Sequence, residues 1–348
     1  MELNGLFSRS KFRSSRLKQY TSLMSKDDPR EIFDDVVASI LDIQGFDTKN
    51  YAPRSVYSVN KLYEALALYG PKNQVRISKD IHFDKGVALA YKCFARPTDS
   101  TETLNLLKGP DLINSVKLEK SSGLPLMTSK RQSLLYSLNR MEQVIYGIKA
   151  PNPCVAYKRT QANKKTRLVW GYPLEMTLIE AQYARPLIDT FKSSFRSPMA
   201  FGLSKPVLGT LLEIEVKQSG KYVYTLDYSK FDSSINSLLI ATAFKILGTW
   251  FSDDDRISRG WDKLVQYFTA TPIVMPDGNL YLGKKHGVPS GSYFTQLVDS
   301  VVNTILIGMI SSRFKLSVDK RKFFVLGDDS IFSSDVRLNM HEVAAFLK

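Results

Sequence analysis

The segment at residues 323–332, FFVLGDDSIF, constrains the fold of this chain more than any other. An apolar run, a Gly-Asp-Asp sequence and a second apolar run are typical of two antiparallel strands joined by a tight turn. Gly327 supplies the backbone freedom that such a turn needs, and Asp328 and Asp329 are expected to project from its tip. Acidic hairpin tips are common, so the hairpin alone leaves the function open.

A second acidic pattern lies upstream, in residues 221–232. The segment KYVYTLD alternates as a strand does and places Asp227 at its C-terminal end. A strongly helical run follows, so Asp232 or Ser233 is a natural N-cap. If the two strands are neighbours, Asp227 and Asp328 could share a pair of Mg²⁺ ions, as two-metal phosphoryl transfer requires. The alternative is that Asp227 is an ordinary turn residue and Asp232 an ordinary cap.

Between these patterns, a small flexible loop at residues 287–291 precedes a long helix. Thr295, Asp299 and Asn303 fall at positions i, i+4 and i+8, so they form one polar stripe on an otherwise apolar helix. An unpaired polar group costs about 1–3 kcal/mol when it is buried. The stripe is therefore expected to face solvent or a polar site, with ordinary amphipathicity as the alternative.

A basic segment at residues 157–167, YKRTQANKKTR, contains five cations and no acid, and the apolar run LVWGYP follows it. This pattern predicts a strand pair that directs cations toward one point. Such a group of cations would bind a triphosphate or neutralise charge that develops during phosphoryl transfer. An exposed basic hairpin without a ligand is the alternative.

Composition narrows the chemistry. The 48 Lys+Arg and 34 Asp+Glu residues of the 348-residue chain give a formal net charge of +14, which favours a polyanionic partner. The three histidines and two cysteines have no zinc spacing, so carboxylate oxygens are the expected ligands of any metal, which points to Mg²⁺ or Mn²⁺. No apolar run is long enough for a membrane span, and no secretory signal is evident. The basic residues 1–30 are either a solvated arm or an RNA contact.

Taken in chain order, four segments resemble those of viral RNA-dependent RNA polymerases, in particular the partitivirus-like enzymes of double-stranded RNA viruses. The matching core spans residues 157–333, and SSGLPL at residues 121–126 is similar to the loop through which the template enters. The segments of the core are YKRTQANKKTRLVWGYP, LDYSKFD, GVPSGSYFTQLVDSVVNT and LGDDS.

The resemblance implies an α+β right-hand polymerase with helix-rich fingers and an antiparallel-sheet palm. A basic arm would span residues 1–30, an N-terminal extension and the fingers 31–220, and the palm 221–348, with a fingers insertion near 252–285. The thumb would be missing, because the chain ends at Lys348, 19 residues after Asp329. The chain is therefore expected to be a fragment.

The resemblance also assigns roles to individual residues. Asp232 would read the ribose 2′-OH, and Arg167 would contact the triphosphate. The catalytic and metal-binding residues would be Asp227, Asp328 and Asp329; the nucleotide-binding residues Lys158, Lys165, Arg167, Asp232, Ser290, Thr295 and Asp299; and the RNA-binding residues Ser121, Ser122, Gly123 and Gly291.

The implied reaction is RNA-templated, two-metal nucleotidyl transfer from nucleoside triphosphates with Mg²⁺ or Mn²⁺. The implied partners are template and product RNA and a viral capsid protein, in the host cytoplasm and within the virion. Two alternatives remain. One is a truncated, non-catalytic fragment that binds RNA or nucleotide. The other is a reverse transcriptase, which is disfavoured because Asp232 stands where such enzymes usually carry a bulky or apolar gate against the 2′-OH.

Overall fold

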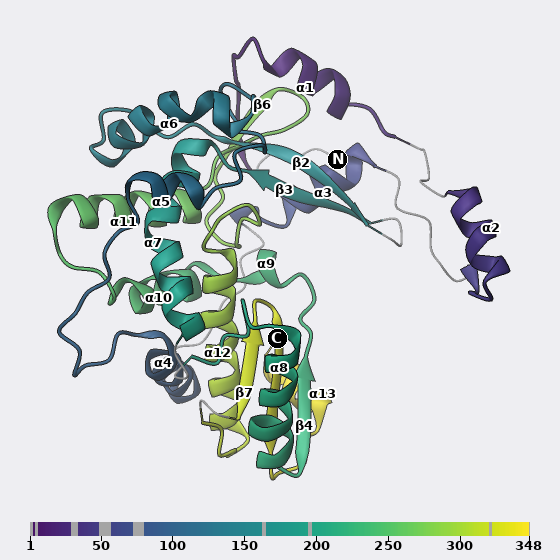
Figure 1. The fold of residues 1–348 in the computed structure, drawn as a ribbon, viewed down its shortest axis with the longest axis vertical. Helices are drawn as coiled ribbons and strands as arrows, with labels where there is room; N and C mark the ends of the chain where they lie inside the picture. Colours follow the sequence, from purple (N-terminus) through teal and green to yellow (C-terminus); the bar gives the residue numbers. More distant parts are fainter. Residues whose placement is uncertain are drawn as a thin grey trace.

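The computed structural model describes residues 3, 6–28, 34–48, 57–71, 80–161, 165–193, 197–319 and 322–347. Helices pack around two separate β-sheets, a three-stranded sheet in the lower part of the molecule and a five-stranded sheet in the upper part (Figure 1). A helix that is both long and apolar enough to cross a membrane does not occur in the described ranges.

The three-stranded sheet has the order β4-β8-β7, and both of its strand pairs are antiparallel. Its two faces are buried against different partners, as the alternation of side chains along a strand requires. Phe323 and Val325 of β7 join the main core, whereas Phe324 packs with Ala200 and Val216 in a second, smaller core. The strands are β4 (Tyr222–Leu226), β7 (Phe323–Leu326) and β8 (Asp329–Ser334).

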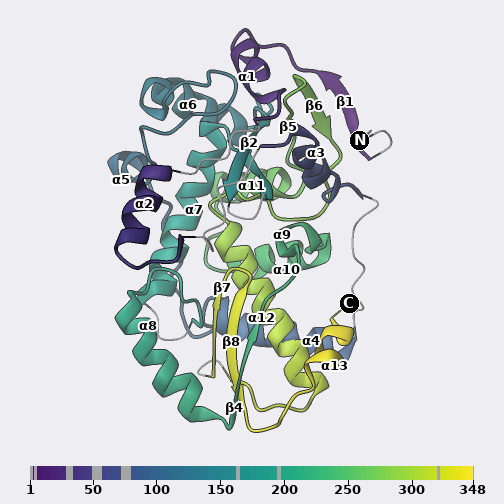
Figure 2. The ribbon, with the colours of Figure 1, turned by 90° about the vertical axis from the view of Figure 1, so that its right-hand side faces the viewer.

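The five-stranded sheet has the order β1-β6-β5-β2-β3. Only the β2–β5 pair is parallel, and β2 and β3 form a long antiparallel ribbon. Figure 2 shows this sheet above the three-stranded one. Its strands are β1 (Ser8–Lys11), β2 (Cys154–Gln161), β3 (Lys165–Gly171), β5 (Ile273–Val274) and β6 (Asn279–Leu282).

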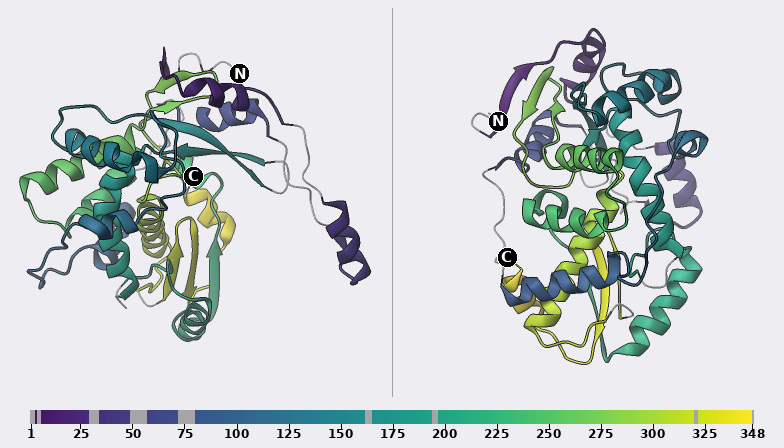
Figure 3. Two further views of the ribbon diagram at one scale, coloured as in Figure 1. Left: turned by 45° about the horizontal axis from the view of Figure 1, so that its top comes forward. Right: turned by 90° about the vertical axis from the view of Figure 1, so that its left-hand side faces the viewer.

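Helix α12 (Thr295–Arg313) is the central helix, and α4 (Ile81–Phe94) crosses it (Figure 3). The two helices approach closely because glycines meet at the crossing. A Cβ atom on Gly86 would lie 2.4 Å from the carbonyl oxygen of Ile305, and one on Gly308 would lie 2.7 Å from the Cα of Gly86. Side-chain-free positions thus allow α4 to support the helix that lies beneath the candidate site.

The remaining helices cover the two sheets. Proline at the first positions of α5 and α8 is tolerated because the first helical N–H groups lack partners in any case. These helices are α1 (Leu17–Met24), α2 (Asp35–Ile43), α3 (Val59–Ala67), α5 (Gly109–Asn114), α6 (Lys130–Ile145), α7 (Leu174–Ser193), α8 (Lys205–Leu211) with its continuation η3 (Leu212–Val216) and η4 (Lys217–Ser219), α9 (Phe231–Ser234), α10 (Ser237–Gly248), α11 (Asp255–Thr269) and α13 (Met340–Phe346).

Candidate active site

The predicted acidic residues meet at one end of the three-stranded sheet. Leu226 pairs with Ser330, so Asp227, which follows β4, lies beside Asp329 at the start of β8. Leu326 pairs with Asp329, which leaves Gly327 and Asp328 as a two-residue turn. Gly327 has φ +65°, a value that such a turn requires and that glycine adopts without strain. The predicted hairpin is confirmed, and the strand that leads to Asp227 is its neighbour, which is the condition for a shared metal site.

Helix α12 holds this turn in place. The side-chain amide nitrogen of Asn303 lies 3.0 Å from the carbonyl oxygens of Gly327 and Asp328 and 3.2 Å from that of Asp329. The hydroxyl of Ser300 accepts a hydrogen bond from the N–H of Gly327 at 3.1 Å. Both side chains are completely buried. Of the two alternatives for the polar stripe, Asn303 therefore faces a polar site. Ser300 was not predicted from the sequence, because it lies beside the stripe and not on it.

Two further aspartates, Asp232 and Asp299, interact electrostatically with Asp328 of the turn. Burial, followed by the charge of Asp328, raises the pKa of Asp232 to about 6, while Arg167 opposes this shift. Burial raises the pKa of Asp299 well above its ordinary value, and Asp232 and Asp328 add to the effect. Asp299 is 2% exposed, and its Oδ1 has no hydrogen-bond partner in the described structure. Burial and the charges of Asp328 and Asp227 also raise the pKa of Asp329.

The expectation that Asp232 or Ser233 caps the long helix is wrong. Both residues lie inside the four-residue helix α9, which begins after Lys230 at φ 56° and ends at the extended residue Ile235. The long helix α10 starts afterwards, where the side chain of Asn236 accepts a hydrogen bond from the N–H of Leu239 at 2.9 Å. Asp232 therefore does not cap the long helix, and its carboxyl group interacts electrostatically with Asp328.

The basic strand pair directs its cations to two different faces. Arg159 and Arg167 are paired directly across β2 and β3, so they share one exposed face, and Arg167 influences the pKa of Asp232. Lys158 belongs to the opposite face, where its ammonium lies 4.1 Å from the ring centre of Tyr57. Arg159 was not assigned to the site from sequence, although its register with Arg167 places it there. The side chain of Lys165 lies outside the described residues.

The loop that precedes α12 packs tightly against β3. A Cβ on Gly291 would lie 1.8 Å from the carbonyl oxygen of Trp170, so no larger residue fits there. Ser290 is exposed, with its hydroxyl 3.4 Å from the carbonyl of Leu168. The hydroxyl of Thr295 donates to loop carbonyls at 2.9 and 3.0 Å, so it stabilises the loop itself. Nucleotide binding by Ser290 and Thr295 stays a prediction.

The loop at residues 121–123 contacts the same strand pair. The exposed hydroxyl of Ser121 lies 3.1 Å from that of Tyr157 on β2, whereas Ser122 is buried and accepts from Ser133 at 3.0 Å. A Cβ on Gly123 would lie 2.6 Å from the carbonyl oxygen of Tyr172, and the backbone there has φ +68°. Ser121 is thus the residue of this loop that is available to a ligand. RNA binding by the loop stays a prediction.

The donor chemistry of the site suits a hard divalent cation. Asp227, Asp328 and Asp329 offer carboxylate oxygens only, and Mg²⁺ is commonly held by one or two carboxylates together with substrate phosphates. Across the described ranges, no three or more His, Cys, Asp and Glu side chains gather closely enough to hold a metal ion by themselves. A ligand set of one or two carboxylates completed by a triphosphate fits this arrangement.

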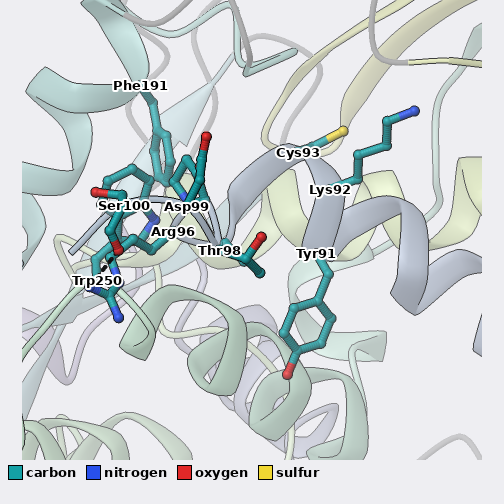
Figure 4. A pocket seen from close by; sticks show the side chains of 11 residues that line it. Tyr91, Lys92, Cys93, Arg96, Thr98, Asp99, Ser100, Phe191 and Trp250 are labelled. Carbon is teal, nitrogen blue, oxygen red and sulfur yellow. Dashed lines mark hydrogen bonds between the residues drawn. The ribbon is translucent and has the colours of Figure 1, made fainter. Parts of the chain in front are cut away.

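A separate pocket lies away from the acidic residues, at the C-terminal end of α4. It has a volume of about 1060 Å³ and is lined by Phe191, Trp250, Arg96 and the segment around it. In Figure 4 the side chains of Phe191, Trp250 and Arg96 cluster at one side of this pocket. The guanidinium of Arg96 bonds the carbonyl of Ser100 at 3.2 Å. No residue predicted for the site lines this pocket.

Comparisons with known proteins agree with this arrangement. The chain belongs to the viral RNA-dependent RNA polymerase family, whose sequence profile matches residues 45–348. The RNA-directed RNA polymerase of Cryptosporidium parvum virus 1 is 27% identical over 252 residues, which cover 69% of this chain and 48% of that protein. The RNA-directed RNA polymerase of White clover cryptic virus 1 is 36% identical over 198 residues, which cover 50% of this chain and 32% of that protein. The predicted family is confirmed.

A solved structure shares the fold. The crystal structure of the RNA-dependent RNA polymerase of a human picobirnavirus matches with a TM-score of 0.74 and 16% identity, over 97% of this chain and 70% of that chain. This likeness establishes a mixed helix-and-sheet polymerase fold. The chain spans about half or less of the two curated relatives named above.

Proposed function

We propose that this chain catalyses RNA-templated RNA synthesis from nucleoside triphosphates. One observation carries the proposal: the strand register brings Asp227 and Asp328 together at one sheet end, where Arg167 of the basic strand pair also acts on the nearby carboxyl of Asp232. In this proposal, the three-stranded sheet is the palm, and the five-stranded sheet with α6 and α7 belongs to the fingers. The partitivirus-like enzymes remain the branch that we favour, in keeping with the relatives named above.

Each group has a distinct task in the proposed reaction. Asp227 and Asp328 would hold a pair of divalent cations, with Asp329 assisting; when bound, the cations would supply charge stabilisation for the transferring phosphoryl group. Arg167, with Arg159 opposite it, would bind the triphosphate by the bidentate contacts that guanidinium groups make with phosphate. Asp232 would accept a hydrogen bond from the ribose 2′-OH of the incoming nucleotide.

The test is the substitution Asp328→Asn, which keeps the size of the side chain and removes its charge. Template-directed incorporation of labelled nucleotide into RNA should be abolished. The matched control is Asp335→Asn, because Asp335 is an exposed acid just beyond the far end of β8 and should be dispensable. Equal incorporation by both variants would contradict the assignment of Asp328. If the unsubstituted chain binds RNA but incorporates no nucleotide, the non-catalytic alternative is favoured.

A further inference from the structure

A row of cations lies on β1, the turn after it and α1, outside the candidate active site. We call it the cationic strip: Arg9, Lys11, Arg13, Arg16 and Lys18, all of them exposed. Residues 6–26 contain no acid. None of the five forms an ion pair with an acidic residue in the part of the chain that the structure describes. Arg9 and the carboxylate of Asp277 both interact with the hydroxyl of Tyr281. The other four cations of the strip present positive charge to solvent without an acidic partner.

The strip is fixed to the body of the protein. Strand β1 pairs along its length with β6, and α1 buries Leu17, Tyr20 and Met24. The hydroxyl of Tyr20 donates to the carbonyl of Ala156 on β2, and its ring packs edge-on against Tyr157. Figure 2 shows β1 and α1 at the top of the molecule, above β2. These contacts favour a preformed binding surface over the solvated arm that the sequence also allowed.

The strip adjoins the loop at residues 121–126. Ser14, in the turn between β1 and α1, donates from its hydroxyl to the carbonyl of Pro125 at 3.4 Å. Tyr157, against which α1 packs, lies within hydrogen-bond distance of Ser121. Lys120, next to Ser121, is another exposed cation. The cations of the strip and Lys120 thus lie on the two sides of the contact between Ser14 and the loop at residues 121–126, and the strip itself contains no acid.

We propose that the cationic strip binds the phosphate backbone of single-stranded RNA and holds it beside the loop at residues 121–126. Phosphates are the fitting ligand because the strip offers several separate cations, whereas its aromatic residues, Phe12 and Tyr20, are partly or fully buried and unavailable for base stacking. Binding would therefore be independent of sequence and sensitive to salt. The role of the bound RNA rests on the proposed function, whereas the binding itself can be measured independently of that function.

The experiment compares two triple variants that remove the same charge. Arg13→Gln, Arg16→Gln and Lys18→Gln neutralise the strip; Lys205→Gln, Lys221→Gln and Lys245→Gln neutralise three exposed cations elsewhere. Affinity for a labelled single-stranded oligoribonucleotide is measured over a salt series without nucleotides or metal. Each lost phosphate contact should reduce the steepness of the plot of log K against log salt by about 0.7. The slope of the strip variant should therefore be shallower by about 2, and the variant should bind RNA about tenfold or more weakly at low salt.

The controls separate this inference from the proposed function. Because nucleotides and metal are absent, the assay reports RNA binding alone, and its outcome does not depend on whether the chain catalyses nucleotide incorporation. The charge-conserving variant Arg13→Lys, Arg16→Lys should keep the salt slope of the unsubstituted protein. A loss of slope caused by damaged structure would not depend on charge in this way. An unchanged slope in the strip variant, or an equal loss in the control variant, would overturn the inference.

Discussion

The side-chain amide of Asn303 donates a hydrogen bond to the main-chain carbonyl of Asp328 at 3.0 Å, across the junction between α12 and the acidic turn. The same nitrogen lies within hydrogen-bond distance of the carbonyls of Gly327 and Asp329, so its two hydrogens are shared among three consecutive carbonyls. Because the turn carries two of the proposed metal-binding acids, the position of α12 determines where these carboxylates lie. Asn303 acts through the turn and is therefore a positioning residue.

We expect Asn303→Leu, which keeps the approximate volume and removes the donors, to lower kcat for nucleotide incorporation by about tenfold or more. The KM for nucleoside triphosphate should change little, since no triphosphate contact is lost. The free energy of unfolding should fall by about 1–3 kcal/mol, because buried carbonyls lose their hydrogen-bond donor. Steady-state kinetics and denaturant unfolding measure the two effects.

The control is Thr304→Val on the next position of α12. Thr304 is also fully buried, but its hydroxyl donates only to the carbonyl of Ser300 within the helix, at 2.9 Å. Thr304→Val should lower the free energy of unfolding but leave kcat for nucleotide incorporation unchanged. Equal kcat values for the two variants would show that Asn303 has no special effect on the turn.

Local patterns in the sequence were enough to predict the acidic hairpin, the strand that leads to Asp227 and the basic strand pair. Each of these depends on alternation and on turn residues within a short segment. The cross-strand pair of Arg159 and Arg167 was missed, because register depends on a turn whose geometry the sequence does not determine. The role of Asn303 was equally hidden, since its partners lie 24 to 26 residues away in sequence.

The carboxyl group of Asp232 should determine the preference for ribonucleotides. Asp232→Ala removes the proposed acceptor for the 2′-OH, so the ratio of kcat/KM for ribonucleotide over deoxyribonucleotide should fall by about tenfold, which corresponds to about 1.4 kcal/mol. Single-nucleotide incorporation with each substrate measures this ratio. Ser234→Ala, in the same short helix, is the control, because the Ser234 hydroxyl donates to the carbonyl of Phe231. A preference unchanged by Asp232→Ala would rule out this role.

Two glycines in helices should respond in opposite ways to alanine. Gly86→Ala places a Cβ against the carbonyl of Ile305, so α4 must move away from α12, at a cost of about 1–3 kcal/mol. Gly209→Ala, in α8, meets nothing within 4 Å and should gain about 0.5–1 kcal/mol from the better helix propensity of alanine. Denaturant unfolding of both variants measures this contrast. Similar changes of the same sign would mean that the close packing of α4 on α12 is not maintained in solution.

Glu180 should make the stability of the protein depend on pH. This glutamate of α7 is fully buried and accepts hydrogen bonds from the hydroxyl of Ser292 at 2.8 and 2.9 Å and from the N–H of Tyr293 at 2.8 Å. Burial raises its pKa from 4.5 to about 8, although these hydrogen bonds oppose the shift. The folded state thus favours the protonated form, and deprotonation places an unpaired charge beneath the loop that precedes α12.

Because the folded-state pKa lies above the unfolded value, the stabilisation is complete below pH 4.5 and is lost as the pH rises through about 8. We expect Glu180→Gln to remove this loss: its amide oxygen can accept from Tyr293 and its nitrogen can donate to Ser292. The free energy of unfolding of the unsubstituted protein should therefore fall, relative to the variant, between pH 4.5 and 8. A tenfold difference in proton affinity between the folded and unfolded states corresponds to about 1.4 kcal/mol. Glu64→Gln, an exposed site on α3, is the control, and parallel pH profiles for all three proteins would contradict the prediction.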